Sequence, residues 1–209
     1  MAIIRTITEK QYTLDEVREI VRAGKAAEVF KVGDQLLVNF DGREVPYDII
    51  GIDAERLASK ELKHSITLQA AELTEERSFD TKGRYGSNCW RTSELREYLS
   101  SEEYLKRYAD LVPYLAAVVK DNTDGQDTEE LFFLLSKEEY EAETTPYEFY
   151  KKQKNCVKAT PEGVTDWHWT RSANRGHSYY TWDVYAGGSV YYGSYAIYAI
   201  RCAPACVIA

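Results

Sequence analysis

The chain has 209 residues, enough for one large domain or for one domain with a small appendage. Hydrophobic residues make up 44% and charged residues 29%, which is typical of a globular protein. The formal net charge of −8 argues against a nucleic-acid partner, because phosphate backbones are bound by basic surfaces. No apolar run approaches the ~20 residues that span a bilayer, and the first residues show no secretory signal, so we expect no membrane insertion.

The first predicted element is a helix that begins at Thr13, where Glu16 completes a capping box. Apolar residues recur on one face of it, and Gly24 is a natural stop. Residues 28–40 alternate like strands with a turn near Gly33, Asp41-Gly42 is a hairpin signal, and residues 45–52 continue as a strand. Residues 1–55 are therefore predicted to form a small helix-and-hairpin element with an accessory or assembly role.

The middle of the chain mixes short strands with capped helices. We expect a strand at 65–68, a helix at 93–99, a helix that begins with a second capping box at Ser100 and runs to Pro113, a buried strand at 130–135, and a helix that begins at Ser136. Residues 121–128 form a polar loop. Its acidic residues do not have the spacing of an EF-hand calcium loop, so a solvated loop is favoured.

Motifs for the common catalytic mechanisms are missing: the sequence has no nucleophile elbow, phosphate-binding glycine loop or H-E-x-x-H zinc motif. Asp166 and His168 alternate with Trp167 and Trp169, and we favour core tryptophans with solvated Asp and His over a catalytic cluster.

The cysteines and histidines give no metal or disulfide signal. An extended segment from Cys202 to Cys206 spans roughly 13 Å, whereas a disulfide needs Cα atoms within ~7 Å. The other cysteines and the histidines show no metal-ligand spacing: Cys89, Cys156, His64, His168 and His177. We therefore expect reduced thiols, no metal, no cofactor and no catalytic residues.

The residues from Ser172 to the end differ from the rest in composition. They contain no Lys, Glu, Gln or Met, although Lys and Glu are frequent upstream, and seven of the 17 tyrosines lie between Tyr179 and Tyr198. Antibody paratopes use the same residues, because Tyr gives a large, stiff contact surface and Ser, Gly and Asn give adaptable hydrogen bonds. Lys or Glu would lose more rotamer freedom on binding. This tail is therefore predicted to be a binding surface.

Strand alternation suggests which tail residues face outward. In residues 181–185, Trp182 and Val184 are expected to face inward, with Asp183 and Tyr185 facing outward, before a hairpin turn at Gly187-Gly188. Arg201 is expected to pair with a carboxylate or with backbone carbonyls of the scaffold. The predicted ligand-contacting residues are His177, Tyr179, Tyr180, Asp183, Tyr185, Tyr191, Tyr192, Ser194, Tyr195 and Tyr198.

Several short motifs follow one another in a recognisable order: residues 88–99 (NCWRTSELREYL), 131–136 (LFFLLS), 169–172 (WTRS), 188–190 (GSV) and 201–208 (RCAPACVI). From about residue 45 to the end, the chain resembles a family of uncharacterised domains from gut bacteria and their phages. One departure is Ala203, which separates Cys202 from Pro204 where the family pattern has a plain Arg-Pro. The resemblance implies an α+β, C-type-lectin-like fold with short antiparallel strands and a few capped helices at 56–209, as in the formylglycine-generating-enzyme-like group.

The tail, at about 172–209, also resembles the variable region of a diversity-generating-retroelement target protein. There, mutation of adenines in Asn codons yields residues such as Tyr, Ser, His, Asp and Gly but never Lys, Glu, Gln, Met or Trp, so Trp182 is interpreted as a fixed position.

This second resemblance implies a non-enzymatic receptor-binding or other surface-displayed protein of a phage or prophage, found on the virion surface or in the host cytoplasm before assembly. Its ligand would be a protein or glycan on a bacterial cell surface, and a homo-oligomer is compatible with it. The alternatives are a formylglycine-generating-type oxygenase that uses Cys202 or Cys206, and a carbohydrate-binding module.

Overall fold

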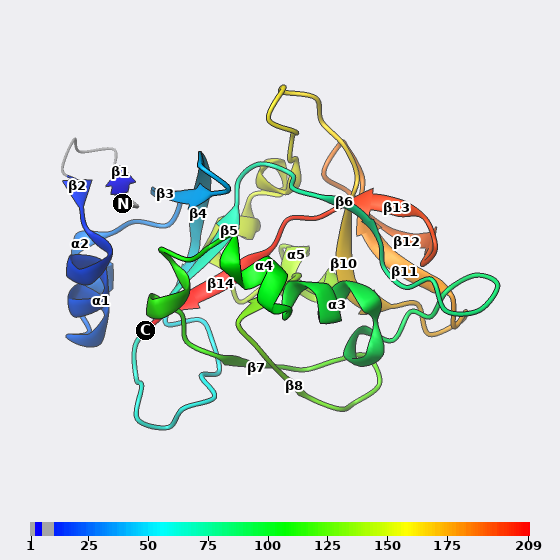
Figure 1. The fold of residues 1–209 in the computed structure, drawn as a ribbon, viewed down its shortest axis with the longest axis horizontal. Coiled ribbons are helices and arrows are strands. Elements are labelled where there is room, and N and C mark those ends of the chain that lie inside the picture. The colour runs from blue at the N-terminus through cyan, green and yellow to red at the C-terminus, as the bar shows by residue number, and fades with distance from the viewer. Residues whose placement is uncertain (1–2, 6–10) are drawn as a thin grey trace.

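A computed structural model describes residues 3–5 and 11–209, apart from the side chains of 3–5, 11 and 192, and shows a mixed α+β fold built mainly from antiparallel strands (Figure 1). The largest sheet has the order β2-β1-β3-β4-β5-β14-β9. Its strands are β1 (Ile3–Arg5), β2 (Gln11–Tyr12), β3 (Gln35–Phe40), β4 (Arg43–Ile52), β5 (Ile66–Ala70), β9 (Phe132–Phe133) and β14 (Ala205–Ile208).

A second sheet has the order β12-β11-β10-β13-β6, and all of its pairs are antiparallel except β10 with β13. Its strands are β6 (Glu76–Ser78), β10 (His168–Ala173), β11 (Tyr180–Val184), β12 (Val190–Tyr195) and β13 (Ala199–Arg201). A small hairpin pairs β7 (Val118–Lys120) with β8 (Thr128–Glu130).

The helices are short: α1 (Leu14–Arg22), α2 (Ala26–Val29), α3 (Glu94–Leu99), α4 (Glu102–Lys106) and α5 (Lys137–Tyr140). Single 3₁₀ turns lie at Trp90–Thr92, Val112–Tyr114, Glu148–Lys151 and Gln153–Cys156. No helix in the described ranges combines the length and the apolar character that a membrane crossing requires. In Figure 1, α1 and α2 lie at one end of the molecule and the sheet with β11 and β12 at the other.

The N-terminal elements largely follow the predictions. Thr13 and Glu16 form the capping box of α1, and Asp41 and Gly42 both have positive φ, 50° and 81°, as a tight hairpin turn between β3 and β4 requires. Residues 28–29 belong to α2, not to a strand, because a helical turn lets Ala26 and Phe30 reach the core. The boundary predicted at residue 55 falls between β4 and β5, which pair directly in one sheet.

In the middle of the chain, Ser93 and Ser136 cap α3 and α5 as predicted. The cap of α4 is Ser101 and not Ser100, and α4 ends at Lys106, well before Pro113. The single strand predicted at 130–135 is wrong. Glu130 ends β8, which pairs with β7, whereas Phe132 and Phe133 form β9, which pairs with β14 in another sheet, so the chain must bend between them.

A buried group of charges joins β10 to the elements before it. Arg171 is 1% exposed, and its guanidinium pairs with the buried Glu139 of α5 and, at 3.2 Å, with Asp121 at the surface. Lys120 lies 3.1 Å from Glu139, 2.5 Å from Glu55, and donates to the Tyr147 hydroxyl at 2.9 Å. Charges removed from water are stable only when paired, so this group fixes the position of β10.

Glu139→Gln should reduce stability by ~3–5 kcal/mol at pH 7, because it leaves two buried cations poorly compensated. Burial by itself would raise the pKa of Glu139, but the charges of Arg171 and Lys120 outweigh it and lower the pKa from 4.5 to about 2. A carboxylate with a lowered folded pKa stabilises the fold above pH ~4.5, and this contribution is lost as the pH falls toward 2.

Urea unfolding at pH 7, 4.5 and 3 should therefore show the gap between the wild type and Glu139→Gln narrowing in acid. Glu148→Gln is the matched control, because Glu148 pairs with Lys151 at the surface, where both side chains are more than half exposed. A constant gap across this pH range would contradict the assignment.

Candidate ligand-binding surface

The hairpin of β11 and β12 carries most of the tail's aromatic residues. The predicted turn at Gly187-Gly188 is confirmed: Gly188 has φ +84°, and its amide donates to the Tyr185 carbonyl at 2.8 Å. A Cβ at Gly188 would lie 2.9 Å from Val157, so the turn packs closely on the neighbouring loop. The hairpin is therefore held at its turn as well as along its strands.

Three rings form the first aromatic group, which we call the Trp167 stack. Tyr185 lies 4.1 Å from Trp167 and 4.4 Å from Tyr191 between ring centroids, with interplanar angles of 30° and 29°. Trp167 is 37% exposed, and both tyrosines are partly exposed. The stack therefore keeps aromatic surface open to water.

The second group, which we call the Tyr195 cluster, is centred on Tyr195. The centroid of Tyr195 lies 4.6 Å from Tyr180, 5.7 Å from Tyr179 with parallel rings, and 5.3 Å from Tyr198. His177 is exposed and contacts the rings of Tyr179 and Tyr180, while Tyr198 is 51% exposed. None of these predicted residues is fully buried.

A groove of about 600 Å³ is lined by members of both groups, and we call it the aromatic groove. Its lining residues belong to β12 and β13 or lie next to β10, β11 and β13. In Figure 1 these strands lie at the end of the molecule far from α1. Its lining is Trp167, Tyr185, Tyr191, Gly193, Ser194, Tyr195, Tyr198, Ala199 and Ile200. Five of these nine residues are aromatic, so a ligand in the groove would contact mainly ring surface.

The prediction that Asp183 faces outward is wrong, because Asp183 is fully buried. It lies beside the core residue Trp169 in the β10–β11 pair and accepts a hydrogen bond from Ser194, itself 4% exposed. Strand alternation separates two faces, but β11 is a central strand with packing on both. Burial raises the pKa of Asp183 from 3.8 to about 7, and the Ser194 hydrogen bond offsets only part of that rise.

Two residues of the surface were missed in the sequence. Trp167 was expected in the core beside Trp169, and only Trp169 is buried, while His168 is buried instead of solvated. Tyr85 packs on Tyr179 and Tyr195 at 5.3 and 5.4 Å between centroids. The glycines on either side of the segment 84–85 were the available signal for an exposed loop. The prediction for the Tyr192 side chain lies outside the described residues.

Asn88 holds the loop that leads into β11. Its side-chain amide donates to the carbonyls of Asn174, His177 and Tyr180 at 3.0, 2.8 and 2.8 Å, and its backbone amide donates to Ser178 at 2.9 Å. Asn88 is 8% exposed, so these bonds form away from water. The residue links the motif at 88–99 directly to the tyrosine-bearing tail.

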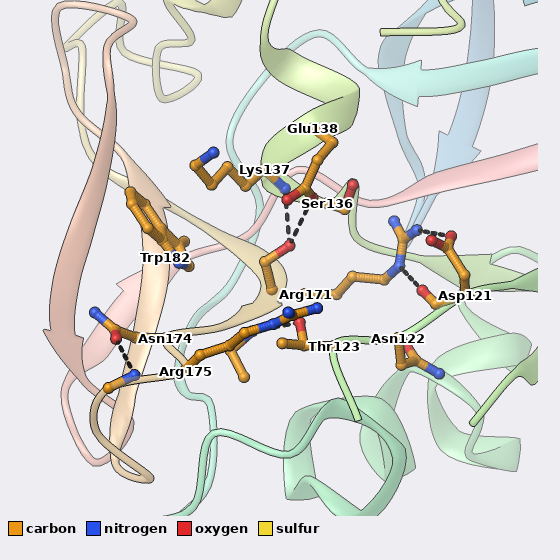
Figure 2. A pocket seen from close by; sticks show the side chains of 13 residues that line it. Asp121, Asn122, Thr123, Ser136, Lys137, Glu138, Arg171, Asn174, Arg175 and Trp182 are labelled. Carbon is orange, nitrogen blue, oxygen red and sulfur yellow. Dashed lines mark hydrogen bonds and ion pairs between the residues drawn. The ribbon is translucent and has the colours of Figure 1, made fainter. Parts of the chain in front are cut away.

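Polar residues line a different cleft of about 380 Å³, shown in Figure 2. Arg171 extends toward Asp121 on one side, and Trp182 stands on the other with the Lys137 ammonium 4.9 Å from its ring. Ser172 accepts a hydrogen bond from the Lys137 amide at 2.9 Å. Trp182, predicted to face inward, is therefore half-buried against this cleft.

The cysteines and Arg201 complete the survey of candidate chemistry. Cys202 and Cys206 are free and buried, and burial raises the pKa of both thiols above the usual value of 9. Arg201 lies 3.6 Å from both Glu76 and Asp166, as expected of a scaffold residue. Within the part of the chain that is described, no three His, Cys, Asp or Glu side chains are placed to hold a metal ion.

Comparison with known proteins gives one match. The family model described as a domain of unknown function (DUF6273) matches residues 62–209, which include every residue of the aromatic groove. No curated protein and no solved structure matches the chain.

Asn88→Ala should loosen residues 174–180 and cost about 1–3 kcal/mol, because three partly buried carbonyls lose their shared donor. Limited proteolysis should then cleave near Arg175, the exposed basic residue of this loop. Asn155→Ala is the control, since Asn155 donates one hydrogen bond to Phe149 in a different loop. Equal cleavage at Arg175 in both variants would contradict a clamping role for Asn88.

Proposed function

The chain belongs to the DUF6273 family, and we propose that it is a non-enzymatic binding protein that uses the aromatic groove and the surrounding tyrosines to hold a ligand on a bacterial cell surface. Within this proposal, residues 56–209 are a C-type-lectin-like domain, and the tail is the variable region of a diversity-generating-retroelement target protein. The protein would serve a phage or prophage as a receptor-binding or other surface-displayed protein.

One observation carries the proposal: the tail that lacks Lys and Glu also supplies nearly all of the groove. Every lining residue except Trp167 lies after residue 172. Tyr and Ser lose little side-chain entropy when a ligand immobilises them, and a groove gives them more contact area than a flat face. The change in composition along the chain therefore coincides with the surface best shaped for contact.

The support beneath the groove fits a binding surface that tolerates substitution. The tyrosine rings contact mainly one another, whereas the bonds that hold the tail in place come from residues outside it, such as Asn88 and Glu139. Ring substitutions would therefore leave the bonds made by Asn88 and Glu139 in place.

The thiols give no comparable support to an oxygenase. A thiol reacts as its thiolate, and burial of Cys202 and Cys206 disfavours that form. A thiol-blocking reagent separates the two hypotheses. Ligand binding by the groove should survive the treatment, whereas catalysis by a thiol should not.

The test is a triple variant, Tyr185→Ser/Tyr191→Ser/Tyr198→Ser. Labelled protein is applied to a glycan array and to intact cells of several bacterial species. Truncation of an interface anchor costs ~2 kcal/mol or more, so the bound signal should fall at least tenfold. The melting temperature should change by less than ~5 °C, because all three rings are partly exposed.

Tyr114→Ser is the control, since Tyr114 is partly exposed but lies under Arg18, outside the groove. If the triple variant still binds, the proposal is refuted. A collapse in its stability would also refute the proposal, because it would assign the rings to the core.

The proposed variability of the tail is tested in the neighbouring DNA. We expect a near-copy of the coding stretch for residues 172–209 that differs only at adenines and lies beside a reverse transcriptase gene.

A further inference from the structure

We propose that the aromatic groove binds a quaternary ammonium group, such as the trimethylammonium end of a choline-bearing molecule. The inference rests on the proposed function and names the chemical class of its ligand. Three features of the groove lead to it: the ring surface of its walls, the Asp183 carboxylate behind Ser194, and the small apolar residues between the rings.

The walls of the groove carry aromatic rings from both aromatic groups. The Trp167 stack supplies Trp167, Tyr185 and Tyr191, and the Tyr195 cluster supplies Tyr195 and Tyr198. Ring faces carry partial negative charge and attract cations that come within ~6 Å of the centroid, most strongly at Trp. Trp167 and Tyr198 are also the most exposed aromatic residues of the lining, so their rings are accessible from solvent.

The floor of the groove has a carboxylate directly behind it. Ser194 lines the groove and donates its hydroxyl to Asp183, whose other oxygen, Oδ1, is buried without a hydrogen-bond partner in the described structure. An acidic oxygen that is buried and unpaired is costly, and a cation seated above Ser194 would compensate it. Burial holds the pKa of Asp183 near 7, and a bound cation would favour the ionised form.

The charge around the groove is negative, as is that of the Asp183 carboxylate. None of the residues that line the groove is Lys or Arg. A smaller pocket of about 240 Å³ shares Trp167, Ala199 and Ile200 with the groove, and its charged lining residues are Glu76, Asp166 and Arg201, which together carry one net negative charge. A cation would therefore be attracted along the groove, and an anion would be repelled.

The lining favours an alkylated ammonium over a primary one. A primary ammonium must place three N–H donors, but Gly193, Ala199 and Ile200 give the lining no side-chain acceptor. The Ser194 hydroxyl is already directed at Asp183, so the tyrosine hydroxyls are the side-chain acceptors that remain. Methyl groups on the nitrogen need no hydrogen-bond acceptor and make dispersion contacts with Ile200 and the rings.

The decisive comparison uses two probes of equal shape, choline and 3,3-dimethyl-1-butanol, in which a neutral carbon replaces the nitrogen. Both are titrated into the full chain by isothermal calorimetry or by NMR of the tail amides, with sodium chloride matching the ionic strength. Choline should bind at least tenfold more tightly, which corresponds to ~1.4 kcal/mol. Equal binding of the two probes, or no choline binding at 50 mM, would overturn the inference.

Three variants locate the effect. Asp183→Asn keeps the shape of the floor and removes its charge, and Tyr191→Leu removes one ring of the Trp167 stack; each should weaken choline binding at least threefold. Tyr114→Leu, outside the groove, should leave it unchanged. Tyr198→Leu provides a second ring variant at the most exposed position, in case Tyr191→Leu unfolds. Choline binding that is equal in all of these variants would place the cation elsewhere and refute the assignment.

The outcome is separable from that of the proposed function. If choline fails to bind while cell or glycan-array binding still depends on Tyr185, Tyr191 and Tyr198, only the cation assignment falls. If neither probe nor any cell surface is bound, the groove is not a binding site and both proposals fall together.

Discussion

The guanidinium of Arg171 must be neutralised where it lies, because it is almost fully removed from water. Its partners come from three places in the chain: Glu139 at the start of α5, Asp121 after β7, and the carbonyl of Leu134 at 3.1 Å. Glu139 in turn neutralises Lys120. Arg171, Glu139 and Lys120 cannot separate without leaving a buried charge unpaired, so β10 is fixed against the scaffold that precedes it. β11 and β13 in turn pair with β10.

The motifs that carry the family resemblance have mostly structural roles of the same kind. Trp90 and Arg96 both donate to one oxygen of Glu130, at 3.0 and 2.7 Å, and Ser93 caps α3 between them. Asn88, at the head of that motif, clamps the loop before β11. The motif residues named here therefore act in the scaffold, and they do not name a ligand.

The tail has two structural roles, one in the core and one at the surface. Its last strand, β14, is buried throughout and lies between β5 and the edge strand β9 of the larger sheet. The hairpin of β11 and β12 instead leaves tyrosine rings at the surface, supported by one another and by Tyr85. The Tyr85 loop is itself held closely, since a Cβ at Gly86 would lie 2.2 Å from the Asp80 carbonyl. A residue composition suited to contact is thus carried on a segment whose end is part of the core.

The sequence alone determined the features that depend on neighbours along the chain. Helix caps at Thr13, Ser93 and Ser136 and the turns at Asp41-Gly42 and Gly187-Gly188 follow from local hydrogen bonding and positive φ, so they were predictable. The abrupt loss of Lys and Glu after residue 171 likewise marked the candidate surface before its shape was known.

Tertiary structure decided what depends on pairing between distant segments. Residues 130–135 divide between two sheets, and Asp183 turns inward because β11 is covered on both faces, which alternation cannot reveal. Trp167 and Tyr85 join the aromatic surface only because β10 and the loop before α3 are brought beside the hairpin. Local propensity fixes an element's type, but the solvent exposure of each face is set by what the rest of the chain packs against it.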